Sequence, residues 1–199
     1  MALVYFDSNV CIGKRGPKDA REIWKSEDIL SAMDRAGISG ALVYSGWAKD
    51  YAPDYGNKRL AEELVKYPRF YGCYTVAPGY TGSFLMPSEI VADMRKKGMV
   101  AAIMFPVTHY FSPCEEVMGE YYAELEKNNI LLLVDKAQIS WQELAELLKQ
   151  HPKLNPRKNP KKNPRKNPLL QPNPPKLLLT MRKAASAPAH LSRSLQLQL

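Results

Sequence analysis

The sequence has few cysteines and no long apolar run. Cys11, Cys73 and Cys114 are odd in number, widely spaced and without a CxxC pair, which argues against a disulfide framework and a structural zinc cluster. No stretch approaches the roughly 18 apolar residues that span a bilayer. Residues 1–6 lack the basic flank and the length of a secretory segment. These absences predict a cytoplasmic protein with no membrane span.

Acidic residues are missing from the last quarter of the chain. All twenty Asp and Glu lie before Pro152, and eleven of the twenty-eight Lys and Arg lie after it. The formal charge of +8 therefore divides into 17 − 20 = −3 for residues 1–152 and +11 for residues 153–199. From Asn155 to Pro168 the unit Asn-Pro-basic-Lys recurs, and such regular prolines interrupt helices and strands. We predict a globular domain over 1–152 and a low-complexity, disordered tail over 153–199.

The tail also lacks aromatic residues. Its lysines and arginines predict weak, non-specific binding of polyanions through neutralisation of phosphates. Stacking on single-stranded nucleic acid has no support, because that mode needs aromatic side chains.

Short apolar runs recur about every thirty residues before the tail. They are continuous rather than alternating, as in parallel strands buried on both faces. The runs are Leu3–Phe6, Ala41–Tyr44, Tyr71–Val76, Val100–Phe105 and Ile130–Val134. Amphipathic helices are predicted between and after them, with start signals at Ser26, Ser88, Ser112 with Pro113 and Glu115, and Ser140 with Glu143. Five βα units with right-handed crossovers leave a doubly wound open sheet or a (β/α)8 barrel as the architectures.

The loop from Gly46 to Tyr55 follows the second predicted strand and is rich in aromatic residues. Its length and composition suit a substrate-facing loop. An aromatic lid packed over the rim of the barrel is an equally good interpretation.

Several stretches of the chain, in order, resemble the amidohydrolase-related family of metal-dependent hydrolases and decarboxylases. They are Phe6-Asp7-Ser8-Asn9-Val10-Cys11-Ile12-Gly13, Met33–Ile38, Lys66–Gly72, Lys97–Pro106, Glu124–Asp135 and Leu148–Leu154. The resemblance covers about residues 1–154. It implies a (β/α)8 barrel and metal-assisted hydrolysis or decarboxylation of small carboxylated or cyclic substrates, with a divalent metal such as zinc or manganese.

The chain departs from the family at the positions that hold the metal. The two histidines after the family's first strand are replaced by Asn9 and Cys11, a histidine after its fourth strand by Phe105, and the ligand after its fifth strand by Asp135. The family's sixth and eighth strands have no counterpart in the tail. The resemblance therefore implies a truncated or degenerate member with about five βα units. An abrupt change of composition within a match is also what a frameshift produces.

An incomplete barrel would leave the first and fifth strands with unpaired edges, which favours oligomerisation or aggregation. A non-catalytic scaffold, or a polyanion-binding protein acting through the basic tail, is the alternative function.

The candidate site residues are expected at the carboxyl ends of strands, where barrel enzymes place their chemistry. Asp7, Asn9, Cys11 and Asp135 are assigned to these ends, and His109 to the loop after the fourth predicted strand. A borderline metal such as zinc could be held by Asn9, Cys11, His109 and Asp135. In a metal-free alternative, Asp7 or Asp135 acts as acid or base. In the structural interpretation, the aspartates bind loop amides, the cysteine packs in the core and the histidine is solvated.

Overall fold

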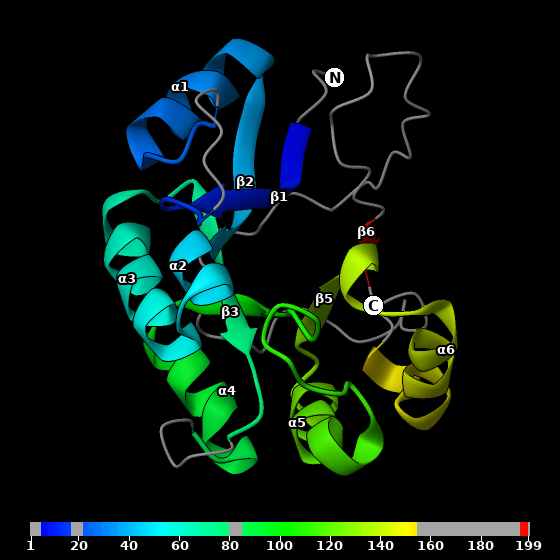
Figure 1. The fold of residues 1–199 in the computed structure, drawn as a ribbon. Helices are drawn as coiled ribbons and strands as arrows, with labels where there is room; N and C mark the ends of the chain where they lie inside the picture. The colour runs from blue at the N-terminus through cyan, green and yellow to red at the C-terminus, as the bar shows by residue number, and fades with distance from the viewer. Residues whose placement is uncertain (1–4, 17–21, 80–84, 155–195, 199) are drawn as a thin grey trace, which may run out of the picture.

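The computed structural model describes residues 5–16, 22–79, 85–154 and 196–198. Its sheet has six strands in the order β1-β2-β3-β4-β5-β6, and the first five are parallel. These five strands curl into half of a barrel with the helices around its outside (Figure 1). The predicted incomplete (β/α)8 barrel of about five βα units is therefore confirmed. No helix in the described parts of the chain is long and apolar enough to cross a membrane.

The parallel strands follow the predicted apolar runs. They are β1 (Tyr5–Ile12), β2 (Ile38–Ser45), β3 (Phe70–Val76), β4 (Met99–Met104) and β5 (Leu131–Asp135). The strand β1 differs most from the prediction, because it continues to Ile12 instead of ending at Phe6. It stays paired with β2 across a register irregularity between Asp7 and Val10. Its polar residues hid this extension from a search for apolar runs. Residues 3 and 4 of the predicted run lie outside the described residues.

The helices occupy the predicted intervals with one addition. Their bounds are α1 (Ser26–Ala36), α2 (Gly46–Asp50), α3 (Pro53–Lys66), α4 (Pro87–Lys96), α5 (Glu115–Lys127) and α6 (Trp141–Gln150), with 3-10 turns η1 (Lys136–Gln138) and η2 (Pro152–Leu154). The added helix, α2, lies in the segment that we predicted as a loop. The hydroxyl of Ser45 caps it by accepting from the Ala48 N–H at 3.2 Å.

The predicted helix starts hold in part. Ser140 and Glu143 form the expected capping box at the start of α6. The prediction of a cap at Ser112 with Pro113 is wrong, because α5 begins at Glu115 and its N-cap residue is Cys114.

Two helices, α1 and α4, begin one residue earlier than predicted. Lys25, not Ser26, is the N-cap of α1, and the Ser26 hydroxyl donates instead to Glu63 on α3 at 2.5 Å. The helix α4 starts at Pro87 after Met86, one residue before the predicted Ser88. In both places the chain enters the helix one residue earlier than the serine signal indicates.

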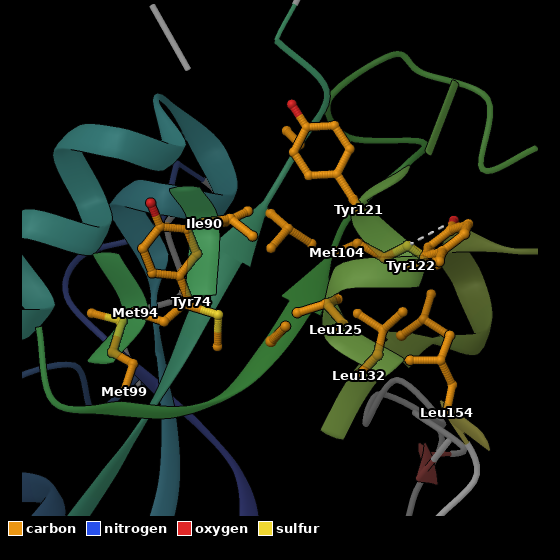
Figure 2. Close-up of a cluster of buried hydrophobic side chains, with 14 of the residues drawn as sticks. Tyr74, Ile90, Met94, Met99, Met104, Tyr121, Tyr122, Leu125, Leu132 and Leu154 are labelled. Atoms are coloured by element: carbon orange, nitrogen blue, oxygen red, sulfur yellow. Dashed lines mark hydrogen bonds between the residues drawn. The ribbon is translucent and has the colours of Figure 1, made fainter. Parts of the chain in front are cut away.

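The larger core lies between the sheet and the helices (Figure 2). Met104 on β4, Leu132 on β5 and Leu125 on α5 are fully buried there. The Tyr122 hydroxyl on α5 donates to the Pro113 carbonyl at 3.0 Å and lies 3.5 Å from the sulfur of Met104. This packing fixes α5 against β4 and so positions the loop that joins them.

A second core lies on the concave face of the half-barrel, away from the helices. It is made of alternate strand residues, as the two-residue period of a strand requires. The buried members are Leu42, Tyr44, Cys73, Ala101, Ile103, Phe105 and Leu133. The aromatic rings of Tyr44 and Phe105 lie 5.5 Å apart near the carboxyl end of this face.

The outer edge of β5 is covered in the structure. The strand β6 (Gln196–Gln198) pairs with it in antiparallel orientation. The expectation that β5 exposes an unpaired edge is therefore wrong over the paired residues, Leu133 to Asp135. Residues 155–195 and 199 of the predicted disordered tail lie outside the described residues. The boundary at residue 152 stays a prediction, although Leu154 is buried in the larger core.

Candidate functional site

The carboxyl ends of the parallel strands gather residues with reactive or polar side chains. Cys11 lies near the end of β1 and Tyr44 near the end of β2, and the two are adjacent partners in the parallel register. His109 lies on the loop after β4, and Asp135 is the last residue of β5. The structure thus brings Cys11, His109 and Asp135 to the predicted edge of the sheet.

Asp7 and Asn9 lie inside β1 rather than at its end, because the strand continues to Ile12. The Asp7 carboxylate accepts a hydrogen bond from the Asn9 backbone N–H at 3.0 Å. This local bond accompanies the register irregularity between Asp7 and Val10. Both residues were predicted at the carboxyl end of the first strand, and the longer β1 places them within it. The bond from a backbone amide to Asp7 is the contact that the structural interpretation gave to this aspartate.

The thiol of Cys11 is protonated at neutral pH. Burial raises its pKa to about 11, although Arg15, a hydrogen bond from Tyr44 and Lys49 all oppose this shift. Burial also raises the pKa of the Tyr44 phenol, and neighbouring Cys11 and the charge of Asp135 add to that shift. Both groups are therefore neutral hydrogen-bonding groups at pH 7, not a thiolate and a phenolate.

The imidazole of His109 is held by the backbone of α2. Its Nε2 lies 2.8 Å from the Lys49 carbonyl and 3.1 Å from the Ala48 carbonyl. Carbonyl oxygens only accept, so Nε2 carries the proton and Nδ1 is the acceptor in the neutral ring. Burial lowers the pKa of His109 more than these carbonyls raise it. The expectation of a solvated loop histidine does not hold, because the ring is half-buried and its edge packs on Phe105 with ring centres 5.8 Å apart.

Asp135 forms a hydrogen bond within the loop that follows β5. Its carboxylate accepts from the Ala137 N–H at 3.0 Å and caps η1. Such a cap is the role that the structural interpretation gave to a strand-end aspartate. Its negative charge also contributes to the raised pKa of the Tyr44 phenol.

The loops after β2, β4 and β5 are tied to one another. His109 joins the β4 loop to α2 through the two carbonyls. The Gln138 side-chain oxygen in η1 accepts from the Thr108 N–H at 3.0 Å and from its hydroxyl at 3.2 Å. The ammonium group of Lys49 lies over the Phe105 ring at 5.1 Å. These contacts fix the position of His109 relative to the strand ends.

A basic residue that sequence reasoning missed lies after β1. The Arg15 guanidinium is 3.6 Å from Glu22 and 4.0 Å from Asp50. The Asp50 carboxylate also accepts from the Gly16 N–H at 2.7 Å. Nearby, a Cβ at Gly46 would lie 2.7 Å from the Gly13 carbonyl oxygen and 3.2 Å from the Cys11 sulfur. Glycine at position 46 therefore allows the β1 and β2 loops to approach.

Three buried side-chain atoms have no hydrogen-bond partner among the described residues. They are Arg15 Nε, Thr75 Oγ1 and His109 Nδ1, of which Arg15 Nε lies 4.0 Å from the Asp50 carboxylate, within ion-pair distance. Their residues lie after β1, near the end of β3 and after β4, all toward the carboxyl ends of the strands. Well over nine in ten buried polar groups in native proteins have a partner. We therefore take this end of the half-barrel as the candidate site.

The predicted metal ligands do not fit a metal ion in this arrangement. Asn9 lies within β1, and Asp135 caps the turn η1. Within the described ranges, no group of three His, Cys, Asp or Glu side chains is placed to hold a metal ion.

Comparisons with known proteins find similarity in structure alone. No protein-family model matches the sequence, and no curated protein matches it. A solved structure of an amidohydrolase II is similar with a TM-score of 0.57 and 9% identity, over 76% of this chain and 65% of that one. A probable 2-pyrone-4,6-dicarboxylic acid hydrolase from Acinetobacter baumannii, with citric acid bound, aligns with a TM-score of 0.45 and 12% identity, over 65% of this chain and 48% of that one.

The chain thus spans less than two thirds of either structure. The similarity to the amidohydrolase II shows that the half-barrel has an amidohydrolase-like fold. The fold implied by the resemblance noted in the sequence is therefore confirmed.

Proposed function

We propose that this chain is a degenerate amidohydrolase-like protein that binds a small polar molecule at the carboxyl ends of its strands without a metal ion. The observation that carries this proposal is a set of buried side-chain atoms without a hydrogen bond among the described residues: Arg15 Nε, Thr75 Oγ1 and His109 Nδ1. A donor, a hydroxyl and an acceptor suit a ligand that carries both a carboxylate and a group able to donate a proton. The positive charge of Lys49 favours an anionic ligand, whereas the charge of Arg15 is balanced by Glu22 and Asp50.

His109 is the residue that we assign to proton transfer. Its lowered pKa keeps the imidazole neutral at pH 7, and the two backbone carbonyls fix the proton on Nε2. The lone pair of Nδ1 then accepts a proton from a hydroxyl group or a water molecule in the site. The charge of Asp50 favours the imidazolium that forms.

Metal-assisted hydrolysis or decarboxylation, the family chemistry, would require a different ligand set. Within the described ranges no three candidate side chains are placed to hold a metal ion, and the carboxylates of Asp7 and Asp135 accept from backbone amides. Asp7 as a catalytic acid or base has the same difficulty. Asp135 is the other proposed acid or base, since its negative charge raises the pKa of the Tyr44 phenol.

Thr75→Val is the sharpest test of the site. Valine keeps the volume of the side chain and removes a hydroxyl that has no partner to lose, so the free protein should keep its stability or gain about 1 kcal/mol. The variant should bind a small hydroxy acid such as malate, which carries both a carboxylate and a hydroxyl, at least fivefold more weakly, as measured by titration calorimetry. His109→Gln should weaken binding as well, with His190→Gln as the matched control.

The metal content of the purified protein distinguishes metal-free binding from metal-assisted chemistry. We expect less than a tenth of an equivalent of zinc or manganese in the purified protein by mass spectrometry, and probe binding that EDTA leaves unchanged. One equivalent of metal, with binding lost in EDTA, would refute the metal-free proposal.

A second candidate function rests on the charge of residues 153–199, which hold eleven Lys and Arg and no carboxylate. Binding of a polyanion by this segment should weaken steeply with salt. A gel shift with duplex DNA at 50 mM and 200 mM salt, for the full chain and a variant ending at Leu154, tests it. A shift that survives removal of the segment would contradict this function.

A further inference from the structure

The two outer strands of the parallel sheet differ in how they avoid pairing with another chain. Edge strands usually carry charges, prolines or bulges that prevent such pairing. The strand β1 has these features: it contains Asp7, and its register is irregular beside that residue. Segment Ile130–Val134, which contains most of β5, has neither a charged residue nor a proline.

The strand β5 is a hazard if its outer edge is left open. A run of five aliphatic residues with no charge is typical of segments that aggregate through their strands. Its inner edge is paired with β4 along residues Leu131 to Val134. Its outer edge is paired with β6 over Leu133, Val134 and Asp135, opposite Gln198, Leu197 and Gln196.

The segment around β6 has the sequence of a strand. Residues Leu195 to Leu199 alternate leucine and glutamine, and an alternation with a period of two is the pattern of a strand with one apolar side. This segment contains no charge and no proline, unlike the repeat between Asn155 and Pro168. The sequence pattern and the pairing in the structure agree.

We propose that the outer edge of β5 is a strand-accepting site, and that Gln196–Gln198 occupies it within the same chain. The occupant blocks the edge against the β5 strand of a second copy. A sixth parallel strand would continue a (β/α)8 barrel at this position, whereas β6 is antiparallel and covers the edge over three residues. The proposal concerns self-association and does not depend on the ligand site.

Two proline variants test the pairing. In a strand, the N–H groups of residues 196 and 198 point to one side and that of residue 197 points to the other. One variant is Gln196→Pro with Gln198→Pro and the other is Leu197→Pro, and proline removes the N–H at each position, so one of the two variants loses the donors that face β5. In the variant that loses these donors, we expect the β5 amides to exchange about tenfold faster with solvent. We also expect dimers or larger species in light scattering at concentrations where the parent chain is monomeric. Gln196→Thr with Gln198→Thr is the control and should behave as the parent.

A peptide of residues 194–199 added to the affected variant should restore the monomer, because it can occupy the same edge. Three results would overturn the proposal. Both proline variants could keep the parent exchange rates and mass, or the parent could self-associate as strongly as the variants. Loss of the far-ultraviolet circular dichroism signal in the variant would also overturn it, since β6 would then be needed for folding rather than for covering an edge.

Discussion

Gly56→Ala should destabilise the protein and disturb the candidate site together. A Cβ at Gly56 in α3 would lie 2.0 Å from the backbone nitrogen of Ala48 and 2.3 Å from its Cα. These atoms belong to α2 and cannot rotate away as a flexible side chain can. Alanine favours a helix over glycine by about 1 kcal/mol, but overpacking against a fixed neighbour costs about 1–3 kcal/mol or more. With backbone atoms this close, we expect the upper end of that range, and a net loss of about 2 kcal/mol.

A loss of this size should lower the melting temperature by roughly 4–8 °C in a domain of this length, which differential scanning calorimetry can measure. The displaced α2 carries the Ala48 and Lys49 carbonyls that hold His109, so the NMR signals of the His109 ring should also move. Gly119→Ala is the matched control, because the three atoms nearest to a Cβ there belong to the end of the Glu115 side chain, which can rotate at the cost of its 2.8 Å contact with His151, and not to the backbone. An unchanged melting temperature for Gly56→Ala, or an equal loss for Gly119→Ala, would refute the close approach of α2 and α3.

Three further predictions test single contacts. Ser140→Ala removes the cap of α6 and should lower the free energy of unfolding in urea by about 1 kcal/mol, with Ser31→Ala, whose hydroxyl caps no helix start, changing it less. Because the folded-state pKa of His109 is below the unfolded value of 6.5, the unfolded chain binds more protons in that window. Stability should therefore fall as the pH drops from 7 to 5, and His109→Gln should flatten this part of the pH profile; an unchanged profile in the variant would contradict the assignment to His109. Alkylation of Cys11 by iodoacetamide should be slow at pH 7.5 and rise steeply toward its pKa of about 11; rapid labelling at pH 7.5, located by mass spectrometry, would contradict the burial of the thiol.

The sequence predicts the βα units well because their signals are local. Apolar runs such as Tyr71–Val76 coincide with strands, and the Ser140 capping box lies where the pattern places it. The helix α2 could not be predicted in this way, because it has five residues and depends on the close approach of Ala48 to Gly56. The strand β6 was missed although its alternation of leucine and glutamine is a strand signal.

The sequence predicted where the candidate site lies better than it predicted which residues belong to it. His109 and Asp135 do lie at the carboxyl ends of strands, because parallel strands bring their ends to one edge. Thr75 and Arg15 were missed: a single hydroxyl inside an apolar strand, and an arginine two residues after a glycine, are weak signals in one sequence. Only the folded chain shows that Thr75 Oγ1 and Arg15 Nε are buried without a partner among the described residues.

The contacts at the strand ends explain how the loops of this half-barrel hold their positions. The loops after β2, β4 and β5 are joined through backbone groups: His109 binds two carbonyls, and Gln138 accepts from the Thr108 amide. None of these bonds requires a metal ion to form. The loop positions are therefore set by the chain itself, through backbone groups that any residue other than proline supplies, so residues between these contacts can be replaced without moving the loops.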